Sequence, residues 1–197
     1  MAVAGVHLHQ IGPRGTRPAA SGFAEAPFEM LTACHERVHR MLRLLARLRE
    51  HLASHGHDEQ AAQAARDVMR YFDLAAPLHH QDEELHVFPV LLAQGDAAVQ
   101  SVVRRLQQDH LAMEQAWPRA RALLQAVADA GPAGAWIPWE AAALQTLDDF
   151  SGRYGEHIRL EEDIVYPAAQ AVLDGPTLSA MGEDMQERRI QRPSSPA

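Results

Sequence analysis

Two segments of the chain carry the same pattern of residues at alternating steps of four and three positions. Its members are Ala65, Met69, Phe72, Ala76, His79 and Glu83 in one segment, and Ala143, Leu147, Phe150, Tyr154, His157 and Glu161 in the other. This spacing places side chains on one buried face of an α-helix. The segments match at an offset of 78 positions, and the match continues through Val-Phe-Pro and Val-Tyr-Pro. The pattern predicts two equivalent amphipathic helices.

A second pair of segments repeats in the same way, at an offset of 75 positions. Leu31, His35, Val38, Leu42, Leu45 and Leu52 correspond to Leu106, His110, Met113, Trp117, Ala120 and Val127. Each stripe again carries one histidine where its neighbours are apolar. The chain is therefore predicted to contain two copies of a helical hairpin.

Glycine-containing breaks separate the helical segments and define the bounds of the predicted helices and domains. The predicted helices cover residues 28–54, 58–93, 96–130 and 138–173, with a short fifth helix at 178–189. Short connections make neighbouring helices antiparallel, so we expect an all-α, up-down four-helix bundle with a short C-terminal extra helix. The bundle is predicted for residues 28–173, a disordered N-terminal segment for 1–27, and the short helix and a frayed tail for 174–197.

Charge and cysteine content exclude several classes of protein. The 197 residues carry 26 acids and 18 bases, for a net charge of -8, and no basic run. Such a chain is not expected to bind nucleic acid. No apolar run approaches the length of a membrane span, and the N-terminus lacks the features of a secretory signal. With Cys34 as the single cysteine, we expect a cytoplasmic protein.

The four histidines of the stripes are predicted to meet. Counted from the breaks between helices, all four fall within roughly one turn of the same level at about 1.5 Å per residue. Glu83 and Glu161 lie one turn beyond His79 and His157, on the same face. Burying two carboxylates without a cation costs several kcal/mol each. The sequence therefore predicts a metal site made of His35, His79, His110, His157, Glu83 and Glu161.

The ligand types narrow the choice of metal. Imidazoles and carboxylates without a thiolate suit iron or manganese. Zinc usually takes four ligands, and six or seven converging groups are too many for one zinc ion. Two ions bridged by carboxylates would use all of them and leave positions for solvent or a diatomic ligand.

Four stretches of the sequence carry a family resemblance. CHERVHRML, YFDLAAPLHHQDEELHVFP, DHLAMEQAW and YGEHIRLEEDIVYP resemble the hemerythrin-like, or HHE cation-binding, family over residues 28–173. The resemblance implies an antiparallel four-helix bundle with an oxo- or hydroxo-bridged, non-haem di-iron centre that binds oxygen or related small molecules. It assigns the ligand positions to His35, His79, Glu83, His110, His157 and Glu161.

The sequence departs from the oxygen-carrying hemerythrins at one position. Those proteins have two histidines at i and i+4 on the third helix, whereas here the second position is Glu114. Either Glu114 is an anionic ligand, or His39, four positions after His35, contributes. Either change alters the charge at one metal ion, which argues against simple reversible oxygen carriage.

Residues next to the stripes are given supporting roles. His80, Glu84 and Glu162 are expected to hydrogen-bond to the ligands rather than bind the metal. His86 is expected to be solvated. Tyr71 and Tyr154 are candidates for radical or supporting groups, but Tyr154 lies in the stripe and is expected to be a core residue. Pro89 and Pro167 are expected to bend their helices.

Three functional hypotheses follow. The leading one is a cytoplasmic di-iron protein that binds or senses oxygen, nitric oxide or peroxide, with manganese as an alternative metal. The second is an oxidoreductase that consumes peroxide or nitric oxide. The third is iron storage, delivery or cluster repair, which ranks lower because no cysteine precedes the predicted bundle. The expected partners are the small-molecule ligand and, for sensing, a separate protein.

Overall fold

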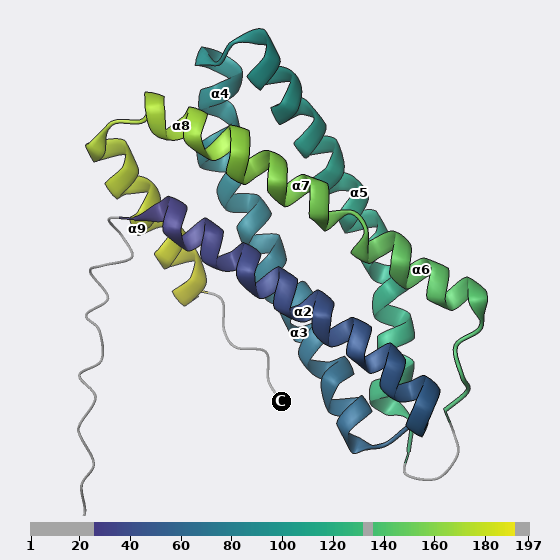
Figure 1. The fold of residues 1–197 in the computed structure, drawn as a ribbon. Coiled ribbons are helices and arrows are strands. Elements are labelled where there is room, and N and C mark those ends of the chain that lie inside the picture. Colours follow the sequence, from purple (N-terminus) through teal and green to yellow (C-terminus); the bar gives the residue numbers. More distant parts are fainter. Residues whose placement is uncertain (1–25, 132–135, 192–197) are drawn as a thin grey trace, which may run out of the picture.

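The computed structural model describes residues 26–131 and 136–191, and within these ranges the protein is entirely helical, without a strand. The all-α prediction is confirmed. Figure 1 shows the long helices lying side by side as a bundle, with α9 against the end where α2 begins. The helices are α2 (Pro27–His55), α3 (Glu59–Asp82), α4 (Phe88–Gln94), α5 (Ala97–Asp129), α6 (Ala141–Ser151), α7 (Tyr154–Leu160), α8 (Tyr166–Val172) and α9 (Gly175–Gln191).

The ends of the helices follow local side-chain chemistry. Asp58 and Asp96 precede α3 and α5, and each carboxylate accepts a hydrogen bond from a backbone N–H in the first turn of the helix. These are standard N-terminal caps. The fourth predicted helix begins at Ala141 instead of Pro138 and is interrupted at Gly152, where α6 ends. It is therefore more broken than its periodicity indicates.

Two wide helical turns replace the simple kinks expected at the prolines. The π-helical segments η1 (Glu83–Val87) and η2 (Glu161–Val165) lie just before Pro89 and Pro167. In each, the N–H of the aromatic residue before proline donates to the carbonyl of the glutamate five residues earlier. Proline has no N–H to donate and its ring would clash with the carbonyl four residues earlier, so a wider turn accommodates it. Both turns begin at a predicted metal ligand.

Two apolar clusters fill the bundle, and the predicted ligands lie between them. Along α2, Leu31 belongs to one cluster and Val38 to the other. Along α5, Leu106 and Met113 flank His110 in the same way. The polar site is thus a layer enclosed by apolar packing on both sides.

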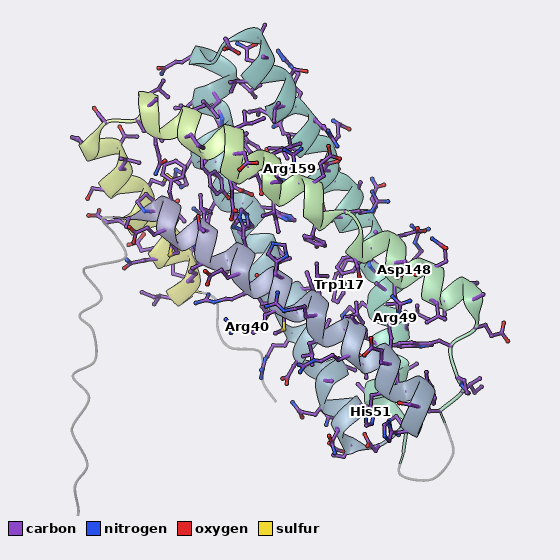
Figure 2. All side chains as sticks on the ribbon, in the orientation of Figure 1. Arg40, Arg49, His51, Trp117, Asp148 and Arg159 are labelled. Carbon is purple, nitrogen blue, oxygen red and sulfur yellow. The ribbon has the colours of Figure 1, made fainter. Side chains whose placement is uncertain are left out.

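At the surface, Arg49 of α2 forms a two-pronged ion pair with Asp148 of α6 (Figure 2).

The C-terminal helix α9 is longer than the predicted 178–189 and packs on the bundle. Met181 and Met185 are buried in one apolar cluster. Arg189 and Arg188 bind the two carboxylate oxygens of Asp82, a fully buried residue, at 2.6 and 2.9 Å. α9 also makes polar contacts with His86 of η1.

The expectation that His86 is solvated is wrong. Its Nε2 lies 2.6 Å from Asp184 Oδ2 of α9 and 3.0 Å from the Arg188 guanidinium. The docked α9 covers this position, and no periodicity within the predicted bundle could indicate that contact.

The predicted disorder of residues 1–27 falls almost wholly outside the described residues, as does most of the predicted frayed tail. The first described helix begins at Pro27. Among the described residues, no helix combines the length and the apolar character that a membrane crossing requires.

Candidate metal centre

The structure brings the six predicted ligands together from both hairpins. Each is at most 6% exposed, in a layer where the neighbouring residues are apolar. They come from α2, α3, η1, α5, α7 and η2, in that order: His35, His79, Glu83, His110, His157 and Glu161. The wide turns present both glutamates one turn beyond the histidines of α3 and α7.

One group of four ligands contains both carboxylates. His35, His79, Glu83 and Glu161 each offer a ligand atom within 4.8 Å of the others. His35 Nε2 lies 3.1 Å from Glu161 Oε2, and His79 Nε2 lies 3.7 Å from Glu83 Oε2. Such a group could hold one metal ion.

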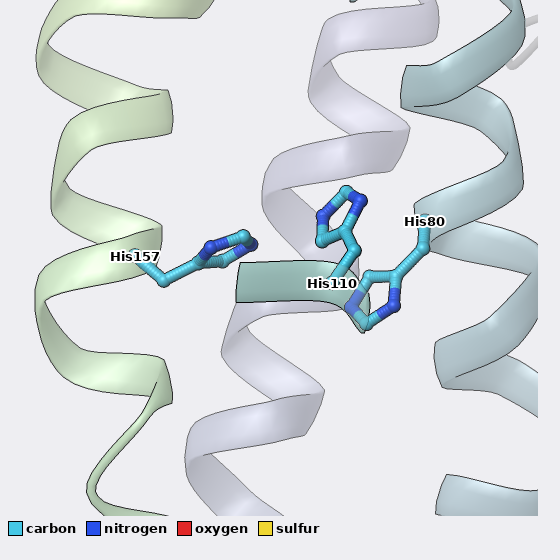
Figure 3. A group of neighbouring side chains, drawn as sticks. All are labelled: His80, His110 and His157. Carbon is cyan, nitrogen blue, oxygen red and sulfur yellow. The ribbon is translucent and has the colours of Figure 1, made fainter. Parts of the chain in front are cut away.

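A second group consists of three imidazoles. His80, His110 and His157 offer nitrogen atoms within 4.8 Å of one another, and their rings come from α3, α5 and α7 (Figure 3). The His80 and His110 rings stack at 4.0 Å, and the His110 and His157 rings are 4.9 Å apart.

The carboxylates connect the two groups. Glu161 Oε1 lies 2.8 Å from His157 Nε2, while its Oε2 contacts His35 of the other group. Glu83 Oε2 lies 3.4 Å from His110 Nε2 and 3.7 Å from His79 Nε2. Each carboxylate therefore faces histidines of both groups, an arrangement suited to bridging two ions.

His80 is the candidate ligand that sequence reasoning missed. It is one position past His79 and off the stripe, so it was expected only to hydrogen-bond to ligands. In the structure, α5 approaches that edge of α3 closely enough for His80 to stack on His110. The adjacent histidines in the sequence were the available signal.

Glu114 and His39, the two alternatives for an extra ligand, lie outside both groups. Both side chains are exposed. Glu114 lines an open pocket on the surface side of His80 and His110. The third imidazole of the group with His110 and His157 comes from His80 of α3.

The expected hydrogen bonds between the ligands and neighbouring glutamates are confirmed for Glu84 and Glu162. Glu162 Oε1 lies 2.8 Å from His35 Nδ1, and Glu84 Oε1 lies 3.1 Å from His110 Nδ1. These two contacts are equivalent in the two hairpins. Each imidazole donates its Nδ1–H to the carboxylate, which directs the other ring nitrogen inward and makes it a better ligand.

Tyr166 adds a contact that has no equivalent in the other hairpin. Its hydroxyl donates to Glu83 Oε1 at 2.5 Å and lies 3.2 Å from His35 Nε2, and its ring stacks on His35. The equivalent residue is Phe88, which stacks on His110 and has no hydroxyl. Of the two tyrosines that the sequence singled out, Tyr71 donates to the Cys34 carbonyl, and Tyr154 is buried in the apolar core as expected.

Several buried polar atoms of the centre lie close to one another but outside hydrogen-bonding geometry. Five of them belong to facing ligands: His110 Nε2, His157 Nε2, Glu83 Oε2 and both carboxylate oxygens of Glu161. Buried polar atoms are seldom left unsatisfied, because each one costs about 1–3 kcal/mol. All five face the space between the ligands, so the donor set fits the imidazole- and carboxylate-bound cations that the sequence predicts.

The proton affinities reflect this crowding. Burial, together with the charge of Glu161, raises the pKa of Glu83 to about 7. Burial opposes a charge on His110, but its close contacts with Glu161, Glu83 and Glu84 outweigh burial and raise its pKa to about 11. Burial also raises the pKa of Glu161, yet contacts with three histidines hold it well below its usual value. Without a cation, protons on Glu83 and His110 offset the buried negative charge of the centre.

Comparison with known proteins identifies a family and a relative. The sequence model of the hemerythrin HHE cation binding domain matches residues 26–169, a range that includes both groups of ligands. An uncharacterized protein of Haemophilus influenzae is 30% identical over 163 residues, which are 83% of this chain and 90% of that protein.

Proposed function

The chain belongs to the hemerythrin HHE cation-binding family, and from this premise we propose that it is a non-haem di-iron protein that binds or senses oxygen, nitric oxide or peroxide. The observation that carries the proposal is the pair of ligand groups linked by Glu83 and Glu161, whose inward-facing oxygens lack hydrogen bonds. From the family resemblance we further infer that the four predicted helical stretches run antiparallel, up and down the bundle. From the charge and the cysteine content we infer a cytoplasmic location.

The candidate ligands can be assigned to two cations. His35 and His79 would bind one ion and His80, His110 and His157 the other, with the two glutamates between them. Iron at these positions would supply reversible electron transfer and an open position for a small ligand. Glu84 and Glu162 orient His110 and His35, and the two apolar clusters cover the layer on both sides along the bundle.

Metal analysis of the purified protein tests the proposal. After expression in iron-rich medium we expect about two irons per chain and an absorption spectrum that changes on reduction and on exposure to oxygen or nitric oxide. The His157→Ala variant is expected to lose metal. His39→Ala is the matched control, because His39 is an exposed histidine outside both groups, and it should retain the full metal content.

Two results would reject the proposal: a folded protein without bound metal, or equal metal content in wild type and His157→Ala. Two equivalents of manganese in place of iron would retain the site and reject iron as its metal.

A turnover assay separates binding from catalysis. An oxidoreductase would consume peroxide or nitric oxide at steady state, and the Glu83→Ala variant would lose that activity. If wild type and Glu83→Ala consume both compounds equally slowly, binding or sensing is the function that remains.

A further inference from the structure

An open pocket of about 580 Å³ lies between α3 and α5, beside the three-histidine group. His80 and His110 form part of its wall, and the remaining wall continues along both helices. Glu83, Glu161, His35, His79 and His157 do not line it. The pocket is therefore adjacent to the space between the ligands and distinct from it.

The size of the pocket exceeds what a diatomic molecule needs. One water occupies about 30 Å³ in the liquid, and a diatomic molecule is of similar size. The pocket volume falls within the range of about 300–1,000 Å³ found for sites that bind organic molecules. The space beside the candidate metal centre is suited to an organic ligand.

Apolar and aromatic side chains form one end of the pocket. Phe72, Met113 and Tyr154 are buried there, and Trp117 is partly buried. Trp117 is held in place by a 2.9 Å hydrogen bond from its indole nitrogen to Asp73. This end would hold a ring or a hydrocarbon chain.

The charge of the pocket selects the polar part of a ligand. Among the described residues, Glu84 and Glu114 line it and no arginine does. Glu84 pairs with the His110 imidazole of the wall, which leaves Glu114 as the carboxylate without a partner. Within the described part of the chain, Glu114 has no ion-pair or hydrogen-bond partner and is exposed one turn beyond His110. An unpaired carboxylate beside aromatic rings favours a cation and disfavours an anion.

We propose that this pocket binds a small organic amine, with its apolar part among Phe72, Met113 and Trp117 and its ammonium group at Glu114. This inference deepens the proposed function and rests on it, because the proposed function supplies the metal centre beside the pocket. Amine binding itself uses side chains outside the two ligand groups apart from the wall formed by His80 and His110. It can therefore be measured independently of metal content.

Fluorescence of Trp117 provides the test, with three probes that share a phenylpropyl body: 3-phenylpropylamine, 3-phenylpropanol and 3-phenylpropionate. We expect the amine to change the emission with a dissociation constant at least about tenfold lower than that of the carboxylate. Glu114→Gln should weaken the amine about fivefold, the value of an exposed ion pair, and leave the alcohol unchanged. Trp117→Phe should abolish the signal, because Trp136 and Trp139 do not line the pocket.

Glu50→Gln is the matched control, because Glu50 is an exposed glutamate on α2 outside the pocket. Its amine affinity should equal that of wild type. The inference is overturned if no probe changes the Trp117 emission, or if amine and carboxylate bind equally and Glu114→Gln has no effect. Metal analysis of the same samples keeps the two proposals apart, because amine binding without metal contradicts only the di-iron function.

Discussion

His80 shows how a single residue off the apolar stripe can complete a metal site. It follows His79 directly, and its ring stacks on His110 at 4.0 Å within the three-histidine group. Without it, the group found among the described residues would keep two imidazoles, His110 and His157. An ion there would then depend on solvent for its remaining ligands.

We therefore predict that His80→Ala selectively weakens one of two metal ions. The affinity of the weaker site should fall by more than about tenfold, since even substitution of residues that only hydrogen-bond to a ligand costs 10–100-fold. Chelator competition measured on wild type, His80→Ala and His39→Ala would show one ion lost early in His80→Ala alone. Identical chelation curves for all three proteins would show that His80 does not bind metal.

The pKa values of two ligands predict that metal binding releases protons. His110, with a pKa raised to about 11, and Glu83, with a pKa raised to about 7, both carry protons in part or in full at pH 7 in the metal-free protein. A metal ion displaces them, because only the deprotonated groups bind it. Apparent affinity should therefore rise with pH between about 6 and 8.

Calorimetric titration with metal in buffers of different ionisation enthalpy measures this release. We expect at least one proton per chain at pH 7. Metal uptake without proton release would contradict the protonation assigned to His110.

Sequence reasoning found the buried ligands because they share a helical period with the core. His35, His110 and His157 replace apolar residues in stripes whose spacing is visible in the sequence. The roles of Glu114 and His80 are harder to predict, because the edge of a stripe faces a neighbouring helix in one place and solvent in another. That difference depends on how closely α3 and α5 approach, which periodicity does not encode.

At the scale of the elements, the long helices were predictable and their interruptions were not. The stretches that became α2 and α5 match the predicted ranges within a few residues. The wide turns η1 and η2 were not predicted, because a proline indicates only that an α-helix cannot continue unchanged. Whether it bends or widens depends on packing, which here turns Glu83 and Glu161 inward.

The C-terminal helix α9 stabilises the turn that carries Glu83. Its Arg188 and Arg189 bind Asp82, the residue just before η1, and its Asp184 contacts His86 within η1. Burial raises the pKa of Asp82 despite the two arginines, so the carboxylate is only partly compensated. The equivalent residues of the other hairpin are Leu160 and Ile164, and no second helix is needed there.

Removing both arginines should therefore destabilise the protein strongly. The Arg188→Ala/Arg189→Ala variant leaves a buried, unpaired carboxylate, and we expect a loss of about 3–5 kcal/mol of unfolding free energy in urea. Asp82→Asn in the same variant should recover part of this loss, because the unpaired charge is gone.

Arg159→Ala is the control for that measurement. Arg159 is an exposed arginine on α7 (Figure 2), and its ion pairs with Glu156 of α7 and Asp163 of η2 are 3.9 and 3.7 Å long. Exposed pairs contribute about 0–1 kcal/mol. An equal loss in Arg159→Ala and in the double variant would contradict a special role for the Asp82 contact.

At the scale of the whole molecule, the candidate centre joins the two repeats. One hairpin supplies His35, His79, His80 and Glu83, and the other supplies His110, His157 and Glu161. Neither half contains a complete group, because each group of the centre takes residues from both hairpins. Cation binding is therefore coupled to the packing of one repeat against the other, and metal should stabilise the fold as a whole.

The size of that coupling can be predicted. A ligand that binds only the folded state at 100 times its dissociation constant adds about 2.7 kcal/mol of stability. For a domain of this size, 1 kcal/mol corresponds to about 2–4 °C, so metal loading should raise the melting temperature by about 5–11 °C. Thermal unfolding with ferrous iron under anaerobic conditions, and again after chelation, measures the shift. His157→Ala should lose it and His39→Ala should keep it, because only His157 belongs to the centre. A shift of equal size in both variants would mean that the metal stabilises the protein from somewhere other than the junction of the repeats.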